Sequence, residues 1–229
     1  MAEQSLQIPA AGVVLAADVA VPDPAGGAVL FAHGSGSSRH SPRNRYVAAE
    51  LQAAGLATVL ADLLTPEEEQ FDERTGRLRF DIGLLATRVT ALTDWVVRYE
   101  ALAGLRIGLF GASTGAAAAL ATAAQRPEPV AAVVSRGGRP DLAGEHLRSV
   151  RQPILLIVGE RDTVVIGLNR QAMRELGGET RLEIVPGASH LFGEPGALEQ
   201  VARLARDWFT RHLPPRSGGQ ESQRRSRCR

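Results

Sequence analysis

The sequence predicts an α/β fold in which a mostly parallel sheet carries helices on both faces. Short apolar runs, rich in β-branched residues, alternate along the chain with longer segments of helical pattern. The apolar runs contain almost no charge, which is expected for strands covered on both sides. With 229 residues, 44% hydrophobic and 22% charged, the chain has the size and balance of one domain with a full core.

Seven short apolar runs are expected to form the strands. In chain order, the predicted strands are Val13–Val21, Ala28–Ala32, Ala57–Ala61, Ile107–Phe110, Ala131–Val134, Ile154–Val158 and Leu182–Val185. Only Asp18 and Glu183 interrupt them with charge. The strands are therefore predicted to lie inside the molecule, between layers of helices.

Five longer segments between these runs have the composition and periodicity of helices. They are Arg45–Ala54, Asp81–Leu102, Ala116–Gln125, Gly167–Leu176 and Leu198–His212. The stretch Leu63–Phe80 is expected to be the longest loop, with solvated charges, at the border of the pocket. Residues 136–152 number only seventeen, which is too few for a lid domain. We therefore expect an uncapped active site.

We expect a single domain over residues 1–213 and a disordered tail over residues 214–229. All 26 basic residues are arginines, and five of them lie in the tail against one glutamate, which leaves 21 basic and 24 acidic groups in residues 1–213. The arginines of the domain are scattered among acids, so we expect no nucleic-acid partner. The absence of lysine excludes Schiff-base, pyridoxal-phosphate and P-loop chemistry.

The single cysteine and the N-terminal segment indicate where in the cell the protein is expected and which partners it is expected to lack. The single cysteine, Cys228, excludes an intrachain disulfide and a cysteine-ligated zinc site. Near the N-terminus, Glu3 and Asp18 interrupt the apolar residues, and no basic segment precedes them. The sequence therefore shows no signal peptide or transmembrane helix. We expect a cytoplasmic protein with no membrane partner, no cofactor and no metal, and with homodimer formation left open.

The candidate nucleophile is Ser113, in the sequence Gly111-Ala112-Ser113-Thr114-Gly115. This G-x-S-x-G pattern directly follows an apolar strand and directly precedes an alanine-rich helix, which is the context that a nucleophilic serine on a sharp strand-to-helix turn requires. The helix that starts there also directs its first amide groups at a developing anion. The alternative is an ordinary glycine turn that opens a helix.

The candidate base and acid follow two later strands. His190 comes after Leu182–Val185, and both Glu160 and Asp162 come after Ile154–Val158. In a parallel sheet these loops share one edge with Ser113, where ligands bind. A serine needs a base to take its proton, and the base needs an acid to orient it. His190 is therefore the expected base, with Glu160 or Asp162 as the acid.

Backbone amides in two loops are expected to form an oxyanion hole. Thr114 follows the nucleophile and should supply one N–H group. The small residues of His33-Gly34-Ser35-Gly36 let the backbone approach a substrate, and Ser35 is the preferred second donor, with Gly36 close behind as a donor or substrate contact. This glycine-rich segment is alternatively a flexible turn.

Arg136 follows a predicted strand at the same edge of the sheet. A guanidinium group there could bind a substrate carboxylate with two hydrogen bonds. It could equally pair with a neighbouring acid and only shape the loop.

Together these segments resemble the α/β-hydrolase superfamily, and more narrowly its small dienelactone-hydrolase-like branch. The matching stretches are LFAHGSGSS (30–38), IGLFGASTG (107–115), ILLIVGERD (154–162) and VPGASHLF (185–192). The resemblance implies an α/β-hydrolase fold with Ser113 as nucleophile, His190 as base and Asp162 as acid. Dienelactone hydrolases in the strict sense use a cysteine where Ser113 stands, so only hydrolysis of acyl esters is implied.

We therefore expect a serine hydrolase that cleaves small carboxylic esters, either short acyl esters or lactones, through an acyl-enzyme. One alternative is a protein of the same fold that only binds its ligand. A second is a short-chain-dehydrogenase-like nucleotide binder, because FGASTG also looks like a dinucleotide loop. That second alternative needs a loop near the N-terminus and a Tyr-x-x-x-Lys pair, whereas the loop begins at Gly108 and lysine is absent.

Overall fold

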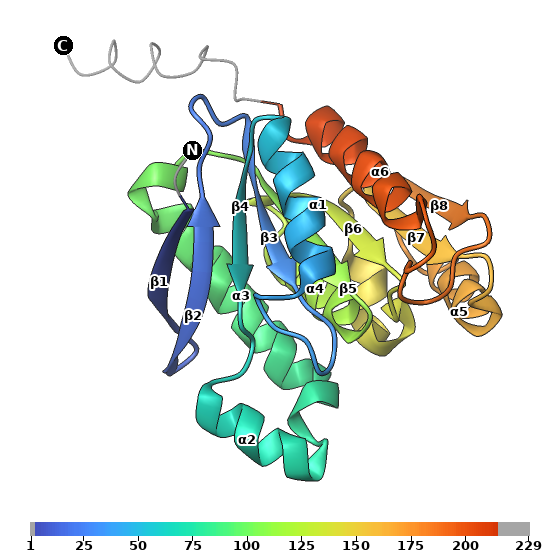
Figure 1. Ribbon diagram of the computed structural model, residues 1–229, viewed down its shortest axis with the longest axis horizontal. Helices are drawn as coiled ribbons and strands as arrows, with labels where there is room; N and C mark the ends of the chain where they lie inside the picture. Colours follow the sequence, from blue (N-terminus) through green and yellow to red (C-terminus); the bar gives the residue numbers. More distant parts are fainter. Residues whose placement is uncertain (1–2, 215–229) are drawn as a thin grey trace.

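The computed structural model of the chain describes residues 3–214, and it confirms the predicted α/β class (Figure 1). One sheet has the strand order β1-β2-β4-β3-β5-β6-β7-β8. The strands are β1 (Glu3–Ala10), β2 (Val13–Ala20), β3 (Gly27–Ala32), β4 (Leu56–Ala61), β5 (Ile107–Ala112), β6 (Val130–Arg136), β7 (Ile154–Gly159) and β8 (Thr180–Val185). The hairpin β1–β2 is antiparallel and joins β4 antiparallel, while β3 to β8 run parallel.

Helices cover both faces of this sheet. They are α1 (Pro42–Ala53), α2 (Pro66–Thr75), α3 (Ile82–Arg98), α4 (Thr114–Gln125), α5 (Thr163–Met173) and α6 (Ala197–His212). In Figure 1, α1 and α6 lie in front of the sheet, and α3 and α4 lie behind it. Three 3₁₀ segments complete the described part of the chain, at Leu78–Phe80, Glu100–Leu102 and Pro140–Ser149.

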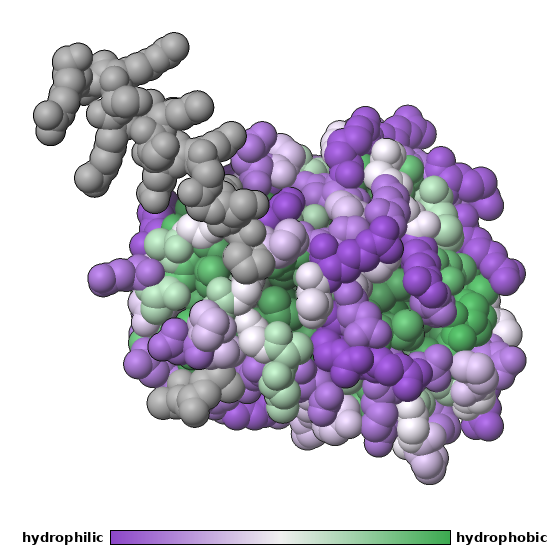
Figure 2. All heavy atoms as spheres, turned by 90° about the horizontal axis from the view of Figure 1, so that it is seen from above, coloured by the Kyte–Doolittle hydropathy of each residue, from purple (hydrophilic) through white to green (hydrophobic). Residues whose placement is uncertain are grey.

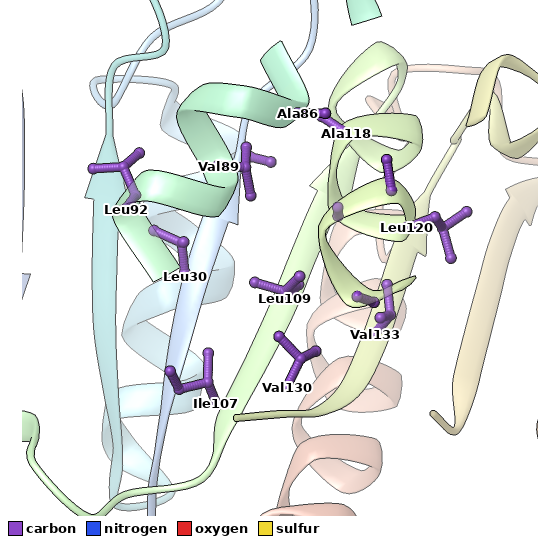
Figure 3. Packing of buried hydrophobic residues seen from close by; sticks show 14 of the residues in the cluster. Leu30, Ala86, Val89, Leu92, Ile107, Leu109, Ala118, Leu120, Val130 and Val133 are labelled. Atoms are coloured by element: carbon purple, nitrogen blue, oxygen red, sulfur yellow. The ribbon is translucent and has the colours of Figure 1, made fainter. Parts of the chain in front are cut away.

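Each face of the sheet buries its own apolar cluster. Figure 3 shows the cluster between the strands and α3 and α4, where Leu30 and Leu109 of the sheet face Val89 of α3. The other cluster packs α1 and α6 against the opposite face, with Phe110 and Phe209 fully buried. Two-sided burial explains why the central strands read as continuous apolar runs.

The sequence prediction missed strand β1. Its side chains alternate between solvent and core, with Ile8 and Ala10 buried, so the segment lacks a continuous apolar run. Pairing with β2 along its whole length forms the strand.

Helix α2 was also missed, because Leu63–Phe80 was expected to be a loop. Local signals for the helix are present: Thr65 and Glu68 form a reciprocal capping box, and Pro66 is the first helical residue. Gly76 ends the helix with φ of 65°. The many exposed charges of the segment concealed these signals.

Within residues 3–214, only the 3₁₀ segment Pro140–Ser149 lies between β6 and β7, so no lid domain is inserted there. No helix in that range has the length and apolarity needed to cross a bilayer. Figure 2, seen from above Figure 1, shows mainly hydrophilic side chains with smaller hydrophobic areas between them. The tail predicted for residues 214–229 lies outside the described residues, apart from Pro214.

Two valines on α3 test the packing of this helix against the sheet. Val89 is fully buried, whereas Val97 is 45% exposed. We expect Val89→Ala to lower the free energy of unfolding by about 2 kcal/mol, because it removes two buried methyl groups and leaves a cavity. Val97→Ala, the matched control, should change it by less than about 0.5 kcal/mol. Urea denaturation of both variants measures the difference, and equal effects would contradict the packing.

Candidate active site

Ser113 lies on a strained turn between β5 and α4. Its φ of 49° and ψ of −120° place a residue with a side chain in a region that favours glycine. A Cβ atom on Gly111 would lie 2.4 Å from the Cα of Ala116, and one on Gly115 would lie 2.2 Å from the carbonyl oxygen of Ala32. Only glycine at these two positions lets the chain turn this tightly.

Backbone hydrogen bonds hold the turn against its strain. The Ser113 N–H donates to the carbonyl oxygen of Arg136, at 3.2 Å. The Ser113 carbonyl oxygen accepts from the N–H groups of Ala116 and Arg139, each at 3.1 Å. The turn is thus fixed to the carboxyl end of β6 as well as to its own helix.

Asp162 and His190 meet beyond the ends of β7 and β8. The Nδ1 atom of His190 lies 2.5 Å from the Oδ2 atom of Asp162, in a charge-assisted hydrogen bond. The two loops touch closely: a Cβ atom on Gly159 would lie 2.5 Å from the carbonyl oxygen of Ala188, and the Arg161 N–H donates to that oxygen at 2.9 Å. This contact between the loops brings the acid to the histidine.

Glu160, the other candidate acid, has a different partner. Its Oε2 atom accepts from the N–H of Gly187 at 2.7 Å, so it supports the turn that leads to His190. Glu194 supports the same loop, because it accepts from the Ser189 N–H at 3.0 Å. This hydrogen bond from the Ser189 backbone is the main cause that holds the pKa of Glu194 below its ordinary value. Both glutamates therefore act on the shape of the histidine loop.

Ser113 and His190 line one hollow of about 270 Å³ at this edge of the sheet. Among the described residues, no hydrogen bond joins the serine hydroxyl to the imidazole. Hydrogen bonds of this kind are often long before a substrate binds and tighten in the complex. Gly34 and Ser35 line the same hollow, so the loops after β3, β5 and β8 meet at this edge of the sheet, as expected.

The loop after β3 packs directly on the serine. A Cβ atom on Gly34 would lie 3.0 Å from the Cβ of Ser113. The Ser35 N–H donates to the Oγ1 of Thr114 at 3.1 Å, which holds the loop against the start of α4. As the first helical residue, Thr114 has an N–H group without an intrahelical acceptor. The two expected oxyanion donors therefore lie on facing backbone segments.

His33 holds this loop in place, a role that was not expected from the sequence. Its Nε2 atom accepts from the Leu63 N–H at 3.1 Å, which leaves the proton on Nδ1, 3.0 Å from the carbonyl oxygen of Gly34. Burial lowers the pKa of His33, so the ring is neutral at neutral pH. The ring thereby ties the loop after β3 to the end of β4. Its place directly after a buried strand was the available signal.

The structure separates Gly36 from Arg136. Gly36, with φ of 67°, lines a neighbouring hollow of about 410 Å³ together with Glu69 and Arg79. Arg136 lines the hollow that contains Ser113, where it is joined by Arg43 from α1. Arg43 is not among the residues expected from the sequence, because nothing in its local sequence distinguishes it from other surface arginines.

No group of three or more histidine, cysteine, aspartate or glutamate side chains in residues 3–214 is arranged to hold a metal ion. Ser113, His190, Arg136 and Arg43 line the same hollow at this edge of the sheet, and Asp162 contacts His190.

Known proteins resemble this chain in sequence and in fold. Two curated relatives from Mycobacterium tuberculosis strains, each named "Putative phosphoribosyl transferase", are 56% identical over 211 residues, which cover 92% of this chain. The chain spans about half the length, 47%, of these relatives. The crystal structure of dienelactone hydrolase from Anabaena variabilis is 57% identical, covers 93% of this chain and 98% of its own, and superposes with a TM-score of 0.91.

A more distant neighbour shares the fold alone. Est1E from Butyrivibrio proteoclasticus is 16% identical, covers 91% of this chain and 98% of its own, and has a TM-score of 0.75. The model of the dienelactone hydrolase family matches residues 13–213, which include every strand of the parallel sheet and every candidate residue described above. By its sequence and its α/β-hydrolase fold, the chain belongs to the dienelactone hydrolase family.

Proposed function

We propose that this chain is a serine hydrolase that cleaves small carboxylic esters or lactones through an acyl-enzyme. Ser113 is the nucleophile, His190 the general base and Asp162 the acid that orients the imidazole. The observation that carries the proposal is the 2.5 Å contact between His190 and Asp162, beside a serine held on a strained turn in the same hollow. Membership of the dienelactone hydrolase family supports hydrolysis as the reaction class.

The proposed reaction has two steps. In the first, the Ser113 oxygen attacks the ester carbonyl carbon while Nε2 of His190 takes the hydroxyl proton. The bond from the carbonyl carbon to the leaving oxygen then breaks, and His190 returns the proton to the departing alcohol. In the second, water attacks the acyl group with His190 again as base, which releases the acid and restores the serine. Asp162 keeps the Nδ1 proton in place and stabilises the imidazolium.

The negative charge on the carbonyl oxygen needs backbone donors. Thr114 and Ser35 are the proposed pair, supported by the contact between their loops. The Ser35 N–H donates to the Thr114 hydroxyl in the free enzyme, so a substrate oxyanion would share or replace that acceptor.

Small substrates are proposed because the hollow is small. A volume of about 270 Å³ holds a short acyl group or a compact lactone. No inserted lid within residues 3–214 provides apolar cover for a long acyl chain. The Anabaena relative is named a dienelactone hydrolase, which supports lactones among the candidates. The Mycobacterium relatives are named as transferases, but this chain matches only about half of their length. Their name therefore does not change the proposal for this chain.

The first test removes the nucleophile and the base. Ser113→Ala and His190→Ala should each lower turnover of 4-nitrophenyl acetate by several orders of magnitude. Ser149→Ala and His146→Ala are matched controls at two exposed positions of the segment Pro140–Ser149, and they should retain the wild-type rate. If Ser113→Ala keeps more than about a tenth of the wild-type rate on every hydrolysed ester, the serine has been misassigned.

The second test separates the two acids after β7. Asp162→Asn should fold normally and lower kcat by about 10³- to 10⁴-fold, because the amide favours the wrong imidazole tautomer. Glu160→Gln should reduce kcat far less, because this side chain contacts the Gly187 backbone instead of the imidazole. Steady-state kinetics of both variants decide the matter. A severe loss in Glu160→Gln with a mild one in Asp162→Asn would reverse the assignment.

The third test distinguishes an enzyme from a ligand-binding protein of the same fold. A fluorophosphonate should label the wild-type protein once, at Ser113, and should leave Ser113→Ala unlabelled, as intact-mass spectrometry would show. A ligand-binding protein without an activated serine would remain unlabelled. The experiment does not depend on knowing the natural substrate.

A further inference from the structure

Two consecutive residues after β4 hold the loop that carries a proposed oxyanion donor. This loop begins at His33, directly after β3. Leu63 holds its beginning, because the Leu63 N–H donates to Nε2 of His33 at 3.1 Å. Asp62 holds its far part, because Oδ1 of Asp62 accepts from the Arg39 N–H at 2.8 Å. Ser35, the proposed donor, lies between these two attachments along the chain.

Asp62 binds Arg39 through both of its carboxylate oxygens. Oδ1 accepts from the Arg39 backbone, and Oδ2 accepts from Nη1 of the Arg39 guanidinium group. The Asp62 side chain is only 12% exposed, so salt screens this ion pair less than it would screen an exposed one. The Asp62 N–H donates to the carbonyl oxygen of Ala16 in β2, at 2.9 Å. A carboxylate with a fixed backbone therefore holds the loop by both the main chain and the side chain of Arg39.

A second buried carboxylate contacts the same guanidinium group. Asp18 of β2 is 4% exposed, and its Oδ2 atom lies 3.7 Å from Nε of Arg39. Asp18 also accepts from the Ser5 hydroxyl at 2.7 Å and from Nη1 of Arg45 at 3.1 Å. Arg39 thus joins the loop to carboxylates on β2 and at the end of β4. Removing one partner of such a buried pair leaves a charge without compensation, so the contact is hard to break.

The loop depends on these attachments because of its composition. Gly34 and Gly36 have no side chains to pack, and Gly36 has a φ of 67°. In the middle of the loop, the Ser35 N–H donates to Oγ1 of Thr114 at 3.1 Å. An oxyanion donor acts only when it lies about 2.7–3.1 Å from the charged oxygen, so a small displacement of Ser35 weakens the stabilisation.

We propose that Asp62 is a positioning residue of the oxyanion hole, which acts through Arg39 to hold the Ser35 N–H in place. This inference rests on the proposed hydrolase function and adds to it a residue outside the hollow, since neither Asp62 nor Arg39 lines the hollow that contains Ser113. Both steps of the proposed reaction pass through an oxyanion. A displaced Ser35 therefore slows both steps, which lowers kcat and leaves KM nearly unchanged.

Substitutions of the pair test this role. Asp62→Ala should lower kcat on 4-nitrophenyl acetate by about 10- to 100-fold, with KM within about threefold of the wild-type value. Asp62→Asn should restore part of the rate, because the amide oxygen still accepts from the Arg39 N–H. Arg39→Ala should also lose less than Asp62→Ala, because it keeps that N–H. The double variant Asp62→Ala/Arg39→Ala should be about as slow as Asp62→Ala alone, because the two residues act together.

Asp94→Ala is the matched control. Asp94 of α3 binds Arg126 through two hydrogen bonds of 2.7 and 2.8 Å. Arg126 follows the last residue of α4, at the opposite end of this helix from Ser113. Asp94→Ala should therefore leave kcat and KM unchanged. An unchanged kcat in Asp62→Ala, or equal losses in Asp62→Ala and Asp94→Ala, would overturn the proposal.

A ketone inhibitor shows whether the loss concerns the oxyanion itself. With 1,1,1-trifluoroacetone, the Ser113 oxygen adds to the carbonyl carbon, the hydroxyl proton passes to His190 and the carbonyl oxygen takes the negative charge. The inhibition constant should rise about 10-fold or more in Asp62→Ala and stay unchanged in Asp94→Ala. A smaller folded fraction lowers kcat without changing the inhibition constant. An unchanged inhibition constant in Asp62→Ala would therefore overturn the positioning role.

Hydrogen exchange separates failure of this inference from failure of the hydrolase proposal, because it requires no activity. Amide exchange in residues 34–38, measured by mass spectrometry, should be faster in Asp62→Ala than in the wild type and unchanged in Asp94→Ala. Unchanged exchange in Asp62→Ala overturns the positioning role, whatever the esterase rates are. If the wild-type protein neither hydrolyses an ester nor reacts with a fluorophosphonate, the hydrolase proposal fails, and the exchange alone decides whether Asp62 holds the loop.

Discussion

The close approach of α4 to the carboxyl ends of β3 and β5 is the constraint on which the site depends. Glycine at 111 and 115 removes the atoms that would collide with Ala116 and Ala32, and this lets the turn hold Ser113 at a positive φ. Such a conformation costs about 1–3 kcal/mol and persists only where the surroundings over-determine it. The hydrogen bonds of Ser113 to Arg136 and Arg139, together with two buried apolar clusters, provide those surroundings.

The sheet and the loops contribute differently to the site. The sheet fixes where each loop begins, and the loops bring polar groups together over short distances: the acid and imidazole through the contact of Gly159 with Ala188, and the loop after β3 through His33. Because these supports are backbone contacts and buried hydrogen bonds, the geometry does not depend on exposed ion pairs that salt would weaken. Arg43 and Arg136 differ from these groups, since within residues 3–214 neither forms an ion pair and each has a buried side-chain nitrogen without a hydrogen-bond partner.

Much of the architecture could be predicted from the letters, because its signals are local. Buried parallel strands appear as apolar runs, and G-x-S-x-G between a strand and a helix marks the turn that holds Ser113. Strand β1 was not predicted because five of its eight residues are exposed, and the strand forms through its pairing with β2. Helix α2 escaped because its capping signals lie within a highly charged stretch, where composition indicated a loop.

The sequence by itself determined the α/β class, the residue types available for catalysis and the strand ends at which they lie. Only the tertiary structure shows which of the two neighbouring carboxylates contacts the imidazole. Glu160 and Asp162 are two residues apart, and the packing of the β7 and β8 loops places Asp162 against His190 and Glu160 against Gly187. The tertiary structure also brought Arg43 beside Arg136, across 93 positions of the chain. Sequence periodicity shows on which side of its own helix or strand a residue lies. These contacts instead join elements that are distant in sequence, and such long-range packing leaves no local signal in the sequence.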